Sequence, residues 1–187
     1  MKKKIIITLI AVCSILFVLG MINVSAETYG YLRYEVSGGK AIITGYSLTA
    51  HGDLEIPSHI SGYPVTEIDD DAFYQCNLGN VTIPNTVTRI GNGAFSYTGV
   101  DSIIIPDSVT NIGDGAFYCC SSLKWVTIGD NVKSIGKNTF YFCNNLESIT
   151  LGKGITSIGD YAFSFCEKLT TVNYNGEESS WNKISIG

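Results

Sequence analysis

The sequence has little of what catalysis usually needs. Among 187 residues there are two histidines, His51 and His59, and they lie close together in the chain. A nucleophilic Ser or Cys needs a base beside it, and zinc needs several converging ligands, so two neighbouring histidines favour neither kind of site. No glycine-rich phosphate-binding motif of the right form occurs either. The sequence therefore predicts no catalytic residues, no cofactor-binding residues and no metal site.

Basic residues are also scarce. The chain has 12 Lys plus Arg against 17 Asp plus Glu, and three of the lysines are Lys2, Lys3 and Lys4. If the first 26 residues are removed, 9 basic residues remain against 17 acidic ones, which gives a net charge of about −8. Nucleic acids and anionic membranes require a basic face, so the acidic balance argues against both as partners.

Only one long apolar run occurs, and it lies at the start. The three lysines precede the apolar stretch Ile5–Ile22, and Val24 and Ala26 provide small residues at the −3 and −1 positions of a cleavage site. This layout predicts a signal peptide over residues 1–26. Because no second apolar segment follows, we expect no membrane span after cleavage and a secreted or cell-surface protein.

The alternative to cleavage is a retained anchor. The apolar run is 18 residues long, and at about 1.5 Å per residue it nearly spans a bilayer core of about 30 Å. Cleavage remains the preferred interpretation because of Val24 and Ala26. Cys13 does not indicate lipid attachment, since it lies inside the apolar run with Val12 rather than a small residue before it.

The rest of the chain is an internal repeat of 22–23 residues. The phenylalanine column is Phe73, Phe95, Phe117, Phe140 and Phe163. An isoleucine column keeps the same phase: Ile68, Ile90, Ile112, Ile135 and Ile158. Two further columns are Leu78, Val100, Leu123, Leu146, Leu169 and Val81, Ile103, Val126, Ile149, Val172. Columns that hold phase over five copies predict about five stacked repeats, each unable to bury its apolar side alone.

Each copy predicts a short strand followed by a short helical turn. Leu123, Val126 and Ile128 alternate with Trp125 and Thr127, as in a strand with one buried side. Pro or Gly then turns the chain at Pro84, Pro106, Gly129 and Gly152. Asp or Asn next marks the N-cap of one helical turn at Asp70, Asn92, Asp114 and Asp160, while Lys137 breaks this column beside Asn138. The predicted fold is a right-handed β-α solenoid.

The two ends of the array predict caps. Residues 29–46 alternate like the two strands of a β-hairpin, with Gly38 and Gly39 at its turn. At the other end, a polar segment with Trp181 and Ile184 follows the last repeat. Open edges of a solenoid invite pairing with other chains, so both caps are structurally expected. The predicted organisation is an N-terminal β cap over 27–53, the solenoid over 54–173, and a C-terminal cap over 174–187.

The repeat resembles the BspA-type leucine-rich repeats of bacterial and protozoan surface proteins. The elements that carry the resemblance are Ile-Pro, Val-Thr-x-Ile-Gly-Asp, Ala-Phe and Cys-x-x-Leu, over roughly residues 50–173. Residues 41–68 are similar to the usual start of such arrays, and residues 174–187 to their final segment. In the family that final segment commonly runs on into another strand, so here either the cap is abbreviated or the chain is a fragment.

The resemblance implies a leucine-rich-repeat fold and a surface or secreted protein that acts in adhesion or recognition, sometimes of extracellular-matrix or other host proteins. It implies no catalytic residues. Members of the family bind diverse partners, so the identity of a ligand does not transfer to this chain.

One cysteine column runs through the repeats: Cys76, Cys120, Cys143 and Cys166, with Thr98 in its gap. Exported proteins often carry disulfides. However, side chains stacked in parallel on adjacent coils lie about 5 Å apart, whereas the Cβ atoms of a disulfide lie about 3.8 Å apart. We therefore expect buried free thiols in this column. Cys119 is expected to point outward, either as a reactive thiol or as a partly buried small residue.

The outward side of the strands is the predicted partner-binding face. Its candidate residues are Asn80, Thr82, Ser102, Ile104, Trp125, Thr127, Ser148, Thr150 and Thr171, and Asn173 continues the second column. Trp125 is the first candidate contact, because aromatic side chains often dominate recognition energetics. The alternative is that the threonines suit strands and Trp125 lies flat against its neighbours. The expected partner is a protein or a glycan.

Two other functions compete with binding. A structural protein whose solenoids assemble with one another, without a specific soluble ligand, is the main alternative. An enzyme is more distant: Asp69–Asp71 and Glu177–Glu178 supply the carboxylates of a glycosidase, but caps or solvated loops explain them better. An enzyme would need carboxylates that converge in one cleft, and we expect none.

Overall fold

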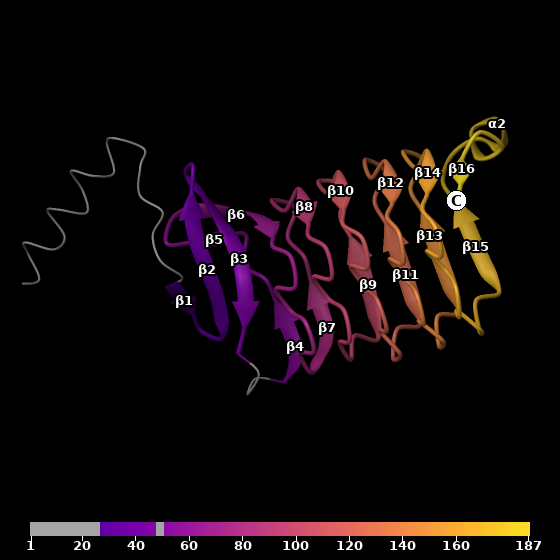
Figure 1. Ribbon diagram of the computed structural model, residues 1–187. Coiled ribbons are helices and arrows are strands. Elements are labelled where there is room, and N and C mark those ends of the chain that lie inside the picture. The colour runs from indigo at the N-terminus through magenta and orange to yellow at the C-terminus, as the bar shows by residue number, and fades with distance from the viewer. Residues whose placement is uncertain (1–26, 48–50) are drawn as a thin grey trace, which may run out of the picture.

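The computed structural model describes residues 27–47 and 51–187. The predicted signal peptide over 1–26 lies outside the described residues. Successive coils of the repeat follow one another along one axis, from the indigo N-terminal end to the yellow C-terminal end in Figure 1. The chain is therefore a β-solenoid with a leucine-rich-repeat fold, as the columns predict.

One side of the solenoid is a six-stranded parallel sheet. Its strands, in spatial order, are β4 (Gly52–Glu55), β7 (Leu78–Thr82), β9 (Ser102–Ile105), β11 (Trp125–Ile128), β13 (Ser148–Leu151) and β15 (Thr171–Tyr174). The repeat length sets the pairing, since Val126 lies opposite Ile103 on one neighbour and Ile149 on the other. Each coil thus adds one strand, and the inward residues of all the strands face one shared core.

A second run of short strands forms another side of each coil. These strands are β6 (Tyr63–Ile68), β8 (Arg89–Ile90), β10 (Asn111–Ile112), β12 (Ser134–Ile135), β14 (Ser157–Ile158) and β16 (Ser185–Ile186). Parallel pairing joins β6, β8 and β10 into one sheet and β12, β14 and β16 into another. The isoleucine column lies on these strands, and its members pack in the core, with Ile158 only partly buried.

The N-terminal segment contains the predicted hairpin. Strands β2 (Leu32–Ser37) and β3 (Lys40–Tyr46) pair antiparallel, and Gly38 and Gly39 have φ angles of 57° and 75° at the turn between them. The edge strand β1 (Glu27–Tyr29) pairs with β2, and β5 (His59–Ile60) with β6. β3 runs parallel to β6, so the hairpin joins the second sheet. The hairpin is confirmed, and its role as a cap stays a prediction.

The phenylalanine column is the centre of the core. The rings of Phe73, Phe95, Phe117 and Phe140 are fully buried and stack in a single file. Centroids of successive rings lie 4.9, 5.3, 5.4 and 5.4 Å apart, with interplanar angles of at most 12°. The last ring, Phe163, is half-buried because no further phenylalanine covers it. The predicted packing of one ring on the next is confirmed.

The predicted helical turn is not confirmed. The segment around each core phenylalanine is a series of turns in which backbone N–H groups alternate between two kinds of partner. The Phe73 N–H donates to the Ala94 oxygen of the next coil at 2.8 Å, whereas the Tyr74 N–H donates to the Asp71 oxygen in its own coil at 3.0 Å. A helix cannot continue through the left-handed residues Asp71 and Gln75, with φ of 55° and 57°.

The Asp and Asn residues predicted as helix caps bond to the next coil instead. Asp70 Oδ1 accepts the Asn92 backbone N–H at 2.9 Å, Asn92 Oδ1 accepts the Asp114 N–H at 2.9 Å, and Asp114 Oδ1 accepts the Lys137 N–H at 2.8 Å. The N-cap assignment is thus wrong for these three residues. Each of these side chains accepts an N–H group from the next coil of the solenoid, not from a helical turn of its own coil.

The C-terminal segment follows the path of one more coil. It contains the helix α2 (Glu178–Trp181) and then β16, whose Ile186 pairs in register with Ile158. Tyr174 packs on Trp181 with 5.5 Å between ring centroids. The array therefore has about six turns rather than about five. The cap role of residues 174–187 stays a prediction.

The cysteine column lies in the core as free thiols, as predicted. Cys76, Cys120 and Cys143 are buried, and Cys166 is half-buried in the last full coil. The thiols of Cys120, Cys143 and Cys166 donate to phenylalanine carbonyl oxygens of the preceding coil at 3.0–3.2 Å. Thr98 occupies the same column and donates its hydroxyl to the Phe95 oxygen at 2.7 Å. Each of these polar atoms thus satisfies a backbone carbonyl inside the core.

Candidate functional site

The outer side of the six-stranded sheet carries the predicted binding residues in two continuous rows. Trp125 lies between Ser102 and Ser148 on the adjacent strands, and Thr127 lies between Ile104 and Thr150. Of the nine candidates, Ser102, Ser148 and Thr150 are half-buried, and the exposed ones are Asn80, Thr82, Ile104, Trp125, Thr127 and Thr171. The sheet brings all nine to one surface, which we call the sheet face.

Two large apolar side chains stand out on the sheet face. Trp125 is 52% exposed and Ile104 is 68% exposed. They occupy diagonal positions on adjacent strands, because Trp125 pairs with Ser102 and Ile104 lies two residues beyond Ser102. Lys124 Nζ lies 5.8 Å from the centroid of the Trp125 ring, which is a cation–π distance. The surrounding residues are small and polar, so this pair is the apolar centre of the face.

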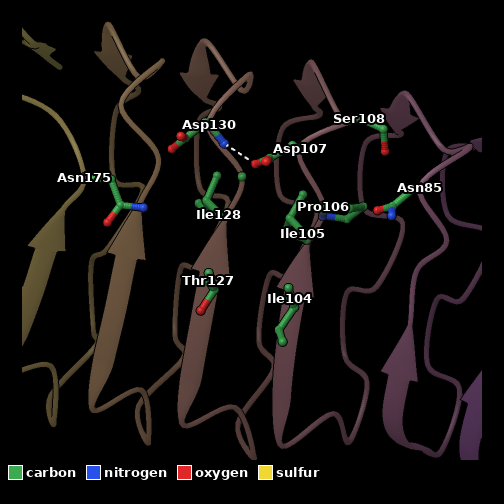
Figure 2. Close-up of a pocket in the computed structure, with 11 residues that line it drawn as sticks. Asn85, Ile104, Ile105, Pro106, Asp107, Ser108, Thr127, Ile128, Asp130 and Asn175 are labelled. Atoms are coloured by element: carbon green, nitrogen blue, oxygen red, sulfur yellow. Dashed lines mark hydrogen bonds between the residues drawn. The ribbon is translucent and has the colours of Figure 1, made fainter.

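Ile104 lines two hollows of the surface. One, of about 360 Å³, extends toward β7 and is lined by Asn80, Thr82, Asn85 and Pro106 among others. The other, of about 620 Å³, extends toward β11, as Figure 2 shows. Ile104, Asn85 and Pro106 line both hollows.

Sequence reasoning missed the loop residues that border the second hollow. They are Asn85, Pro106, Asp107, Ser108, Asp130 and Asn175. A signal was available, because Asp107 and Asp130 directly follow the turn residues Pro106 and Gly129 in two successive repeats. The alternation of inward and outward residues holds only within the strands, so it predicts no binding residues in these loops.

The acidic side chains beside the second hollow are fixed by the next coil. Asp107 Oδ1 accepts the Asp130 backbone N–H at 2.7 Å, as the dashed line in Figure 2 marks. Asp130 Oδ1 accepts the Lys153 N–H at 3.1 Å, and its other oxygen lies 3.3 Å from Lys153 Nζ. The pKa of Asp130 is lowered, chiefly by the backbone hydrogen bond from Lys153. The Asp130 carboxylate at the border of the hollow is therefore ionised, and hydrogen bonds hold both aspartates in place.

The other carboxylates considered for catalysis lie elsewhere. Arg89 on β8 pairs with Asp70 at 2.7 Å, with Asp69 at 3.6 Å and with Glu67 at 3.8 Å, at the end of the neighbouring strand β6. Glu178 is in the first turn of α2 at the C-terminal end. These two acidic groups lie on separate coils and do not share a hollow with the sheet face.

Within residues 27–47 and 51–187, no group of three or more His, Cys, Asp or Glu side chains is arranged to hold a metal ion. Over the same ranges, none of the helices has the length and apolar character that crossing a bilayer requires.

Solved structures of bacterial leucine-rich repeat proteins resemble this chain. A leucine-rich cell surface protein from Faecalibacterium prausnitzii A2-165 is 29% identical, with a TM-score of 0.70, over 86% of this chain and 42% of its own. A leucine-rich repeat protein from T. pallidum is 26% identical, with a TM-score of 0.64, over 80% of this chain and 82% of its own. One from Bacteroides capillosus ATCC 29799 is 27% identical, with a TM-score of 0.53, over 82% of this chain and the whole of its own.

The chain spans less than half the length of the first of these proteins. No curated protein matches the sequence. The family described as the BspA type leucine rich repeat region matches residues 66–185 in six copies, which is more than half of the chain. This match includes the segment that follows Tyr174, in agreement with the extra coil that β16 completes. The chain belongs to the BspA-type leucine-rich repeat family.

Proposed function

We propose that this protein is a secreted or cell-surface binding module that recognises a protein partner through its sheet face. The observation that carries the proposal is the exposed pair Trp125 and Ile104 at the centre of a small, polar, rigid surface. Interfaces commonly place a few apolar anchors inside a polar rim. The relative from Faecalibacterium prausnitzii is described as a cell surface protein, which supports the proposed location.

The hollows beside Ile104 support the same role. A partner side chain that enters either hollow would contact Ile104 and Pro106, with Asn85 at the border of both. Parallel strands joined at every coil hold these residues in one register, so little conformational freedom is lost when a partner binds. The site offers shape, apolar contact and polar rims. It has no nucleophile paired with a base, and we accordingly propose recognition and no catalysis.

The test is binding of the purified protein to an array of extracellular-matrix proteins. Trp125→Ala and Ile104→Ser should each weaken capture at least tenfold, because each removes an apolar anchor. The matched controls lie off the face: Ile186, which is 70% exposed on β16, and Trp181 on α2. Ile186→Ser and Trp181→Ala should leave capture unchanged. Equal losses for Ile104→Ser and Ile186→Ser would refute the sheet face as the binding surface.

Self-assembly of solenoids is the second candidate, and the last coil favours it. Val172 on β15 is 47% exposed, whereas the residues of the same column on the preceding strands are buried. Among the strands that the structure describes, β15 pairs with β13 alone. Light scattering over a range of protein concentrations separates the candidates: a mass that rises with concentration supports assembly, and a constant mass with retained capture supports recognition.

A further inference from the structure

Two columns follow the core phenylalanines and are not part of the sheet face; Ser96 is their one buried member. The first column, one residue after each phenylalanine, is Tyr74, Ser96, Tyr118, Tyr141 and Ser164. The second, two residues after it, is Gln75, Tyr97, Cys119, Phe142 and Phe165. We call the six aromatic members, Tyr74, Tyr97, Tyr118, Tyr141, Phe142 and Phe165, the aromatic strip. They lie on the turn segments between the second sheet and the six-stranded sheet.

The rings of the aromatic strip touch one another from coil to coil. The centroids of the Tyr74 and Tyr97 rings are 5.7 Å apart, those of Tyr97 and Tyr118 5.6 Å, and those of Tyr118 and Tyr141 5.1 Å. Phe165 continues the series at 5.2 Å from Tyr141. The strip is therefore one continuous surface along the solenoid axis, with about one ring step per coil.

The strip exposes much of its apolar surface. Tyr97 is 48% exposed, Phe142 45% and Phe165 53%. Tyr118 and Tyr141 stack in parallel at an interplanar angle of 2°, so each covers a face of the other and presents its edge and hydroxyl. Phe142 and Phe165 are tilted by 43° and Tyr97 and Tyr118 by 52°, which leaves parts of these ring faces open. A contiguous apolar patch of this kind on a soluble protein commonly marks a binding site.

The backbone under the second column is strained. Tyr97, Phe142 and Phe165 have φ angles of 58°, 60° and 61°, in the left-handed region that bulky residues rarely adopt. The other left-handed position of each coil mostly has residues suited to it, including Gly93, Gly115 and Asn138. Strained residues at functional sites are often kept for what their side chains do. Core packing does not explain these aromatic residues, because their rings point outward.

The strip carries no charge, in contrast to the rest of the chain. None of the ten residues in the two columns is acidic or basic, although the chain has a formal net charge of −5. The pKa of the Tyr97 phenol is raised, first by its hydrogen bond with the Cys119 side chain, so this hydroxyl stays neutral. The chemistry available to a ligand is thus aromatic faces and edges with phenolic hydroxyls between them, and the half-buried Ser164 hydroxyl at one end.

We propose that the aromatic strip is a second binding site, separate from the sheet face, and that it takes a neutral polysaccharide. The face of a sugar ring presents C–H groups that pack on the negative face of an aromatic ring, and sugar hydroxyls can form hydrogen bonds with the phenols. A ligand made of repeated rings matches a site that repeats one ring step per coil. Neutrality favours an uncharged polymer, since nothing in the two columns would pair with the charges of an acidic one.

The test is the migration of the purified protein in native gels that contain a soluble polysaccharide. The probes are hydroxyethyl cellulose, as a neutral β-glucan, and polygalacturonate, as an acidic polymer of similar length. The neutral polymer should retard the protein and the acidic one should not. No retardation by hydroxyethyl cellulose, or equal retardation by both polymers, would overturn the proposal.

The deciding variant is Tyr97→Asn combined with Phe142→Asn and Phe165→Asn. Asn adopts left-handed backbone readily, so the variant should keep its melting temperature while its affinity for hydroxyethyl cellulose falls at least tenfold. Trp125→Ala is the matched control and should be retarded like the wild type. Unchanged retardation of the triple variant refutes the proposal. A loss with Trp125→Ala alone also refutes it, because the polysaccharide would then bind to the sheet face. Capture by matrix proteins measures binding to the sheet face in a separate assay, so the two proposals can fail independently.

Discussion

The molecule has two files of stacked aromatic rings, and they differ in almost every physical respect. The inner file, Phe73 to Phe163, has the same residue at the same position in every coil and is buried in all but the last. The outer file, the aromatic strip, mixes Tyr and Phe over two columns and is largely exposed. The inner rings are nearly parallel throughout, whereas the outer ring pairs range from 2° to 79°.

The difference separates packing from recognition. A ring covered on both sides by the rings above and below contributes to the stability of every coil that it touches. A ring at the surface on left-handed backbone contributes less and costs conformational energy. Substitutions in the inner file should therefore change stability, and substitutions in the outer file should change binding.

The largest effect is expected at the middle of the inner file. Phe117→Ala should lower the free energy of unfolding by about 3–5 kcal/mol, because it leaves a cavity between Phe95 and Phe140. Urea denaturation measures this change directly. An unchanged unfolding midpoint would contradict this expectation, since the inner ring would then contribute no more to stability than an outer one.

A smaller loss is expected at the end of the same file. Phe163 stacks on Phe140 on one side only and is half-buried. Phe163→Ala should therefore cost about 1–2 kcal/mol in the same denaturation experiment, since less apolar area is removed from contact. A loss equal to that of Phe117→Ala would show that something else covers this ring.

The Asp70 carboxylate should make stability depend on pH. Its pKa is lowered, first by the backbone hydrogen bond from Asn92 and also by Arg89. Because the folded pKa lies below the ordinary value of 3.8, the stabilisation is fully present above pH 3.8 and is lost as the pH falls below it.

The matching variant is Asp70→Ala, which should cost about 0.5–1.5 kcal/mol at pH 7, as is usual for hydrogen bonds. Below pH 3.8 the difference between the variant and the wild type should shrink. Thermal unfolding at pH 7 and pH 3 measures both values, and a difference that grows in acid would contradict the assignment.

The smallest effect should be a gain. Tyr161 has a φ of 57° and is 67% exposed. Tyr161→Asn should raise the free energy of unfolding by about 0.5–1 kcal/mol, because Asn accepts left-handed backbone with less strain. The corresponding change at Phe142 also removes ring contacts with Tyr141 and Phe165, so its net effect should be closer to zero. Differential scanning calorimetry of the two variants sharpens the contrast between an isolated ring and one in the strip.

The core could be predicted from the sequence because its positions are constant. The Ile and Phe columns hold phase, and burial of a column requires only that the coils stack. The turn segment was predicted wrongly because Asp, Asn and Gly favour both helix caps and left-handed backbone. Gly93, Gly115 and Asn138 share one column, and this was the available sign of a repeated left-handed residue.

The candidate site was predictable for the strands and not for the loops. Alternation in the strands places Trp125 and Ile104 on one face, whatever the details of the turns. The position of Asp107 depends on a hydrogen bond to Asp130 in the next coil, which no local pattern specifies. Only one column of the aromatic strip, Tyr74, Tyr118 and Tyr141, is visible in the sequence, where it indicates packing between repeats or plain surface. The second column lacks a constant residue type, so the sequence does not show that the two columns form one strip.

The bonds between coils have one further consequence. The Asp and Asn side chains join residues that are 22 or 23 positions apart, and so do the strands. Removal of residues 101–123 would join Val100 to Lys124 with every later column still in phase. The unit that such a chain can gain or lose is thus a whole turn, so the length of the array can change in discrete steps while its cross-section stays the same.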